Sequence, residues 1–175
     1  ANYNEFYEKR WFASGADFRE PADMDFCGFE TKIGSRLFDL GGGAILGIEL
    51  CEDLWVPCPP SGELVQKGAN IIANLSASDE YASKAQYREQ LVLNQSARCV
   101  CGYVYAGASV FESTTDLLFG GALFAAENGS MLAQGERFLR RTNLICADID
   151  IEKLSALRLK NMSFENSVSH AEAVC

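Results

Sequence analysis

The stretch from Ala44 to Pro57 limits the possible folds of this chain more than any other. An apolar run from Ala44 to Leu50 has the length and composition of a β-strand, and it ends in a cysteine, two carboxylates, a tryptophan and then prolines. A thiol at such a strand-to-turn elbow lies at one edge of a sheet, where a substrate can reach it. Cys51 is therefore a candidate nucleophile. The alternative is that Cys51 is a small buried hydrophobe, a common environment for a free cysteine.

The other cysteines and the histidine narrow the chemistry that is open to Cys51. The seven cysteines are odd in number, include no C-x-x-C pair, and several lie in apolar strand-like runs, so neither zinc nor another metal is expected. The single histidine, His170, lies in a polar stretch near the C-terminus. A Cys-His or Ser-His-Asp mechanism within this chain is therefore not expected. If Cys51 is a nucleophile, its base must be a carboxylate or a lysine.

Composition and charge exclude several classes of function. The 175 residues, 48% of them hydrophobic, can bury the core of one domain or of a large part of one. The formal net charge of −9 argues against binding to nucleic acid or to an anionic membrane, since both require a basic face. No apolar run reaches membrane-spanning length, and the chain does not open with a signal-peptide pattern. These features predict a soluble, cytoplasmic protein.

Hydrophobic patterning predicts alternating strands and helices, and hence an α/β fold. Strands are expected at residues 27–33, 36–40, 44–51, 69–75, 100–106, 117–126, 130–134 and 144–149. Helices are expected at residues 61–67, 83–98 and 150–159, and turns at 41–43 and 128–129. Residues 161–175 lack periodicity and are expected to form a linker or tail. If the strands at 44–51 and 69–75 are parallel, their carboxyl ends bring Cys51 close to Ser76 and Ser78, where an open α/β sheet binds its ligand.

Six segments, in order along the chain, carry a resemblance to a known family. They are residues 47–61, 73–78, 95–99, 103–105, 112–117 and 127–129. Together they closely resemble the glutaminase domain of bacterial glutamine-dependent NAD+ synthetase, a member of the nitrilase, or carbon–nitrogen hydrolase, superfamily. The resemblance runs from Asn2 to about Leu159. It implies a nitrilase-like α-β-β-α sandwich over residues 1–160, partial because the first strands and helices are missing, with residues 161–175 leading toward an absent synthetase domain.

This resemblance implies catalysis by a Glu-Lys-Cys triad in which Cys51 is the nucleophile. The backbone N–H of Glu52 would hold the tetrahedral oxyanion together with the triad lysine. The family's lysine falls just before Ala1 and its base glutamate further upstream, so the chain alone is expected to be inactive. Glu5 matches a further carboxylate beside the triad. Without the resemblance, Glu5 is read as half of an exposed ion pair with Lys9.

For substrate binding, the resemblance points to Tyr3, Ser78 and Lys84, with Trp55 and Glu8 as pocket walls. Lys84 is a suitable partner for the α-carboxylate of L-glutamine, and Glu8 for its α-ammonium group. On the sequence alone, these residues can also be a solvated lysine at a helix start, a surface glutamate, a core tyrosine and a loop serine.

The resemblance further implies that released ammonia travels to the chain's own synthetase domain, which uses ATP and Mg2+ to amidate deamido-NAD+, within a homo-oligomer. No cofactor is expected in this chain, since Gly41–Gly43 lacks the Lys-Ser/Thr of a phosphate-binding loop. Two alternatives stay open: a free-standing amidase or nitrilase of the same superfamily, and a catalytically inactive structural fragment.

Overall fold

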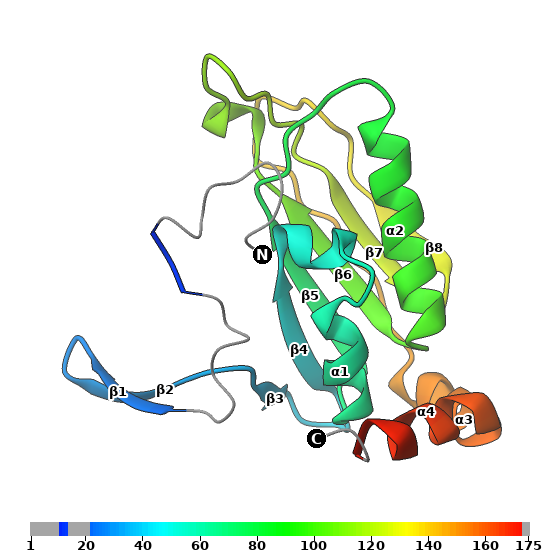
Figure 1. Ribbon diagram of the computed structural model, residues 1–175. Coiled ribbons are helices and arrows are strands. Elements are labelled where there is room, and N and C mark those ends of the chain that lie inside the picture. The colour runs from blue at the N-terminus through cyan, green and yellow to red at the C-terminus, as the bar shows by residue number, and fades with distance from the viewer. Residues whose placement is uncertain (1–10, 14–21, 173–175) are drawn as a thin grey trace.

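The computed structural model describes residues 11–13 and 22–172. Its strands are β1 (Ala22–Phe26), β2 (Phe29–Ile33), β3 (Leu37–Asp39), β4 (Ile45–Leu50), β5 (Ile71–Ser76), β6 (Gly102–Gly107), β7 (Leu123–Glu127) and β8 (Ser130–Gln134). Its helices are α1 (Pro60–Gln66), α2 (Lys84–Arg98), α3 (Ile151–Lys160) and α4 (Met162–Glu172), with single 3-10 turns at Cys51–Trp55 and Val110–Glu112. Figure 1 shows α1 and α2 against one face of the large sheet and α3 and α4 at one end of it.

The large sheet has the strand order β3-β4-β5-β6-β7-β8. β4, β5 and β6 run parallel because a helix connects each to the next, and the outer strands pair antiparallel. At Gly41–Gly43 the three φ angles are 83°, 60° and 80°, a turn that glycine forms without strain. Both the hairpin around these glycines and the parallel pairing of the Cys51 strand with the next strand are confirmed predictions.

Side chains alternate between the two faces of the large sheet. On β5, Ile72, Asn74 and Ser76 are buried, whereas Leu75 on the opposite face is 56% exposed. The buried face packs against α1 and α2 and supplies most of the hydrophobic core. The fully packed core side chains are those of Leu54, Leu64, Val65, Ala69, Ile72, Val92, Cys99, Cys101, Tyr103, Tyr105, Ala122, Phe124 and Ala126.

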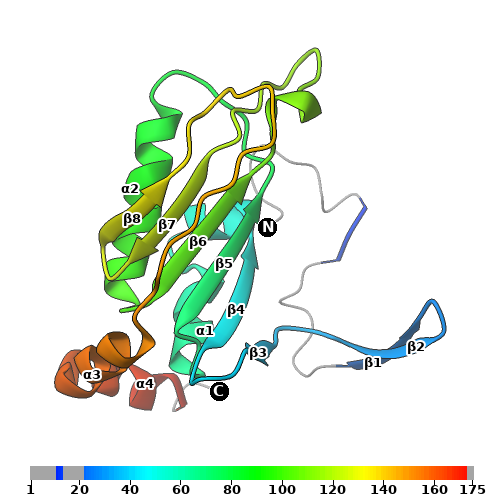
Figure 2. The ribbon, with the colours of Figure 1, turned by 180° about the vertical axis from the view of Figure 1, so that it is seen from behind.

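The opposite face of the sheet carries the segment that follows β8 (Figure 2). Gly102 on β6 leaves room for this segment, since a Cβ at this position would lie 2.8 Å from the side chain of Ile149. Several apolar side chains elsewhere on this face are between 37% and 56% exposed, among them Ile48, Leu75 and Val104. An apolar sheet face normally packs against another layer. The described residues therefore provide one helix layer and one sheet layer of the expected sandwich.

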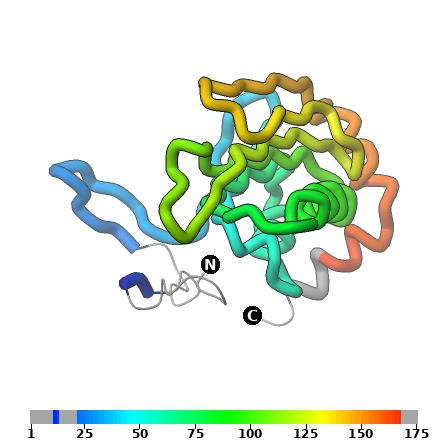
Figure 3. Tube along the Cα trace, turned by 90° about the horizontal axis from the view of Figure 1, so that it is seen from above, coloured from blue at the N-terminus to red at the C-terminus, as the bar shows by residue number. Residues whose placement is uncertain are grey.

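β1 and β2 form a separate hairpin that projects from the body of the molecule (Figure 3). Phe26 pairs with Phe29 beside the turn, and Cys27 and Gly28 in the turn both have positive φ. The strand expected at residues 27–33 therefore begins two residues later. The sequence reading missed its partner β1, whose charged residues Asp23 and Asp25 are uncommon in strands.

Three further predictions are wrong or incomplete. Residues 144–149 form no strand, because Ile149 lies over the central strand β6 rather than beside a sheet edge where its backbone could pair. The strand expected at 117–126 begins only at Leu123. In place of an irregular tail, residues 162–172 form α4, which packs against α1 and α3 through Phe164. The division of the chain at residue 160 stays a prediction.

Arg158 of α3 connects α3 and α4 with the segments that precede β5 and β6. Its Nε donates to the carbonyl of Val100 at 3.0 Å, and its Nη2 donates to the carbonyls of Ala69 at 2.9 Å and Cys99 at 3.2 Å. The guanidinium also lies 5.1 Å from the ring centre of Phe164. One side chain thus satisfies carbonyls after α2 and before β5 while it holds α3 and α4 in place.

We predict that Arg158→Met lowers the free energy of unfolding by about 2 kcal/mol, because buried carbonyls lose charge-assisted hydrogen bonds. Urea unfolding followed by circular dichroism measures this change. Arg98→Met, at an exposed arginine in the last turn of α2, serves as the control and should cost about 0.5 kcal/mol or less. Equal losses in the two variants would contradict the role of Arg158.

Candidate active site

Cys51 lies at a sharp turn directly after β4. Its φ angle is 48°, a left-handed conformation that is uncommon for a residue with a side chain. The carboxylate of Asp53 accepts the N–H of Leu50 at 2.8 Å and so fixes the reversal of the chain. The thiol is partly buried. The structure thus has the strand-to-turn elbow that the sequence predicts, and the candidate nucleophile is one of the residues with a positive φ.

The end of β5 supplies hydrogen-bonding groups to the thiol. Leu50 pairs with Leu75 in the parallel ladder, so that Cys51 and Ser76 are neighbours at the carboxyl ends of the strands. Burial raises the pKa of the Cys51 thiol above its ordinary value, and hydrogen bonds from the Ala77 N–H and the Ser76 side chain oppose this shift. The thiol is therefore mostly protonated at neutral pH and needs a base before it can attack.

A chain of buried hydrogen bonds runs behind the elbow. The hydroxyl of Tyr103 donates to the Glu49 carboxylate and accepts from Asn74 Nδ2 at 3.2 Å. The same Nδ2 lies 3.4 Å from the carbonyl of Cys51, and Asn74 Oδ1 accepts from Ser76 Oγ at 2.7 Å. Burial and the charge of Glu49 raise the pKa of Tyr103 far above its ordinary value, so its hydroxyl stays a donor. These contacts fix the backbone of Cys51 and the side chain of Ser76 together.

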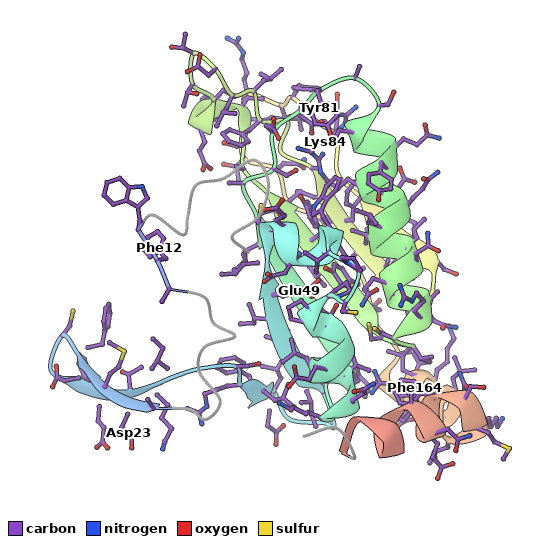
Figure 4. The ribbon with its side chains drawn as sticks, in the orientation of Figure 1. Phe12, Asp23, Glu49, Tyr81, Lys84 and Phe164 are labelled. Carbon is purple, nitrogen blue, oxygen red and sulfur yellow. The ribbon has the colours of Figure 1, made fainter. Side chains whose placement is uncertain are left out.

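Two of the predicted substrate-binding residues are buried close to the elbow. Ser78 is 8% exposed and Lys84 is 6% exposed, so Lys84 is not a solvated surface lysine. Lys84 Nζ forms an ion pair with Asp79, and it lies 5.4 Å from the ring centre of Trp55 and 4.7 Å from that of Tyr81. Figure 4 shows Lys84 beside Tyr81 at the start of α2. The structure therefore brings Trp55, Ser78 and Lys84 to the same end of the sheet.

Tyr3, Glu5 and Glu8 lie outside the described residues, so their predicted roles stay predictions. Glu52 directly follows Cys51, and its N–H opposes the rise in the pKa of the thiol. Within residues 11–13 and 22–172, no group of three or more histidine, cysteine or acidic side chains could hold a metal ion. No helix in the same ranges is long and apolar enough to cross a membrane.

The sequence reading missed several charged residues of this region. Asp79, Glu80 and Arg88 are hydrogen-bonded to one another or to Lys84, and Glu49 is 2% exposed behind the elbow. The spacing of Lys84 and Arg88, four residues apart on a helix, could have indicated that both point toward the same neighbours. A glutamate within an apolar strand could have indicated a buried partner in the same way.

Comparisons with known proteins found similar sequences and similar structures. No family model matches the chain. The glutamine-dependent NAD+ synthetase of Mycobacterium tuberculosis strain H37Rv is 39% identical over 171 residues, which are 96% of this chain and 25% of the relative. The crystal structure of a glutamine-dependent NAD+ synthetase from Cytophaga hutchinsonii superposes with a TM-score of 0.69 and 26% identity, over 82% of this chain and 23% of that one. The chain is related to glutamine-dependent NAD+ synthetases.

The fold class follows from a second structural likeness. A carbon–nitrogen hydrolase from Helicobacter pylori G27 superposes with a TM-score of 0.58 over 74% of this chain and 50% of that one, at 21% identity. The predicted nitrilase-type fold and the predicted resemblance are therefore confirmed. The chain spans about a quarter of the length of the curated relatives it matches, so the activity of the whole protein is a matter for proposal.

We predict that alkylation of Cys51 by iodoacetamide in the 175-residue chain accelerates with pH through a midpoint above the usual cysteine pKa of about 8.5. The midpoint lies above the usual value because burial disfavours the thiolate and so raises the pKa of Cys51. At any pH below this midpoint, the buried thiol therefore reacts more slowly than an exposed one. Peptide mass spectrometry at a series of pH values measures the rate. In urea the midpoint should return to the usual value, and a native midpoint at or below it would contradict the prediction.

Proposed function

We propose that this chain is part of the glutaminase domain of a glutamine-dependent NAD+ synthetase and takes part in releasing ammonia from L-glutamine. The observation that carries the proposal is the position of Cys51. A turn with a positive φ places its thiol at the carboxyl ends of parallel strands, beside backbone N–H groups and at the same end of the sheet as buried Ser78 and Lys84. The similarity to glutamine-dependent NAD+ synthetases supports the same substrate.

In the proposed reaction, a base removes the thiol proton and the sulfur of Cys51 attacks the carboxamide carbon of glutamine. A C–S bond forms, and the backbone N–H of Glu52 stabilises the oxyanion. The oxyanion collapses, the C–N bond breaks, and the amide nitrogen takes up a proton and leaves as ammonia. Water then attacks the thioester, which releases glutamate and restores the thiol. The resemblance assigns the base and the cationic oxyanion donor to a glutamate and a lysine upstream of Ala1, with Glu5 as a further carboxylate.

Substrate recognition in this proposal combines hydrogen bonds with charge. Ser78 and Lys84 bind the α-carboxylate of glutamine, while Trp55 contributes a wall beside the lysine, 5.4 Å from its Nζ. Because Lys84 is already paired with Asp79, the substrate carboxylate shares this cation with Asp79. Tyr3 and Glu8 complete the site, with Glu8 as the partner of the α-ammonium group.

The proposal extends to the rest of the protein. A synthetase domain uses the ammonia to amidate deamido-NAD+ with ATP and Mg2+, in a homo-oligomer located in the cytoplasm. The described residues contribute Cys51, Trp55, Ser78 and Lys84 to the glutaminase side of this proposed reaction. The second candidate, a free-standing amidase, shares the fold. An amidase for neutral amides does not need charged residues that bind the α-carboxylate and α-ammonium groups of an amino acid.

The first test labels the full-length protein with a diazo-ketone analogue of glutamine. We expect the adduct on Cys51, because among the cysteines that the structure describes this one lies at the elbow, and we expect Cys51→Ala to abolish ammonia release from glutamine. Mass spectrometry of the labelled peptides and an ammonia assay measure the two results. Cys58, which is exposed, is the control thiol. An adduct on Cys58 in place of Cys51 would disprove the assignment of the nucleophile.

The second test separates the two candidate functions. Lys84→Ala should reduce kcat/KM for glutamine by about 10- to 150-fold, the equivalent of about 1.5–3 kcal/mol for a hydrogen bond to a charged group. Hydrolysis of a small neutral amide should change much less, because such a substrate has no α-carboxylate. Steady-state ammonia release with both substrates provides the comparison. Equal losses would favour the amidase or a purely structural role for Lys84.

A further inference from the structure

One buried arginine, Arg88, contacts three consecutive residues between β5 and α2, the first of which is Ser78 of the proposed substrate clamp. Its side chain is 1% exposed. Nη2 donates to Ser78 Oγ at 3.3 Å, to the carbonyl of Ser78 at 3.5 Å and to the carbonyl of Asp79 at 3.1 Å. Nη1 donates to Glu80 Oε1 at 2.7 Å. We refer to residues 78–80 as the clamp turn.

The clamp turn connects Arg88 to both members of the proposed substrate clamp. Ser78 contacts Arg88 directly, and Lys84 is paired with Asp79, whose backbone Arg88 holds. Lys84 and Arg88 are also one helical turn apart on α2. A guanidinium is planar and rigid, so its donors are satisfied only when the acceptors take up fixed positions. Arg88 therefore orients Ser78 and Asp79 relative to the helix that bears Lys84.

The polar contacts of Arg88 are not explained by core packing alone. Glu80 compensates the buried charge and also accepts from Arg137 Nη1 at 3.2 Å, while its N–H donates to the carbonyl of Leu118 at 2.7 Å. Arg88 Nε, however, is one of two buried side-chain nitrogen or oxygen atoms in the described ranges without a hydrogen-bond partner. A buried cation with an unpaired donor costs stability, whereas an apolar side chain of similar volume would not.

We propose that Arg88 is a positioning residue for glutamine recognition, which holds the clamp turn so that Ser78 and Lys84 meet the α-carboxylate of the substrate. This inference rests on the proposed glutaminase function. Arg88 acts on the substrate through Ser78 and the Asp79–Lys84 pair and takes no part in the reaction at Cys51. Its loss therefore weakens the recognition of an amino-acid-shaped ligand and spares the reactivity of the thiol.

The test compares two electrophiles that react with Cys51 in the full-length protein. A diazo-ketone analogue of glutamine needs the clamp, whereas iodoacetamide needs only the thiol. In Arg88→Lys, which keeps the charge and loses the planar fork, we expect labelling by the glutamine analogue to slow by about tenfold to a hundredfold. Alkylation by iodoacetamide should stay within about twofold. For glutamine hydrolysis, KM should rise by a similar factor with a smaller change in kcat.

Arg158→Lys is the matched control, since Arg158 also donates to backbone carbonyls but lies away from the clamp turn. This variant should leave the preference between the two electrophiles unchanged. Arg88→Met should show at least the loss of Arg88→Lys, and Arg88→Lys alone decides the result if Arg88→Met fails to fold. Urea unfolding of each variant checks that the native state is populated.

Three outcomes would overturn the inference. Equal slowing with both electrophiles in Arg88→Lys would show that Arg88 only supports the fold. An unchanged rate with both would show that the clamp turn does not depend on the guanidinium. If the unmodified protein itself reacts with iodoacetamide at Cys51 but not with the glutamine analogue, the proposed function fails and this inference fails with it. The unmodified protein therefore distinguishes the last outcome from the first two.

Discussion

The parallel pairing of β4 with β5 is the constraint on which the candidate site depends. In this register Glu49 lies opposite Asn74 and Leu50 lies opposite Leu75. A slip of one residue would move Glu49 or Asn74 to the other face of the sheet, away from Tyr103 and from the N–H of Ser61. Because a buried carboxylate without partners is costly, these polar contacts select the observed register. The position of Cys51 beside Ser76 follows from it.

Two groups of buried charged side chains lie around the elbow. Behind Cys51, the Glu49 carboxylate orients Tyr103 and, through it, Asn74. Beyond the end of β5, Arg88 and Glu80 form a second buried pair. Buried ionic groups of this kind contribute little net stability, but they hold particular geometries because only a few arrangements satisfy all donors and acceptors. In the proposed function, the first group supports the nucleophile and the second supports substrate recognition.

Much of the local structure was predictable from the sequence, and the failures have physical causes. The helix at residues 84–98 and the hairpin at Gly41–Gly43 were predicted close to their bounds. Both predictions rest on local signals, namely hydrophobic periodicity for the helix and the conformational freedom of glycine for the turn. Asp150 caps α3 as predicted and accepts the N–H of Lys153 at 2.9 Å. Residues 144–149 have strand-like composition but pack across a sheet face, and α4 depends on the packing of Phe164, so neither could be inferred from composition.

By itself, the sequence determined that a thiol ends an apolar strand, that His170 is the only histidine, and that a serine-rich segment follows the next strand. These features are local, since they depend on neighbours within a few positions, and they sufficed to single out Cys51. The tertiary structure decided that Lys84 is buried against Asp79, that Arg88 holds the clamp turn, and that Glu49 is linked to Asn74 through Tyr103. These contacts join residues on different elements, and their energies depend on burial and hydrogen-bond geometry, which exist only once the chain has folded.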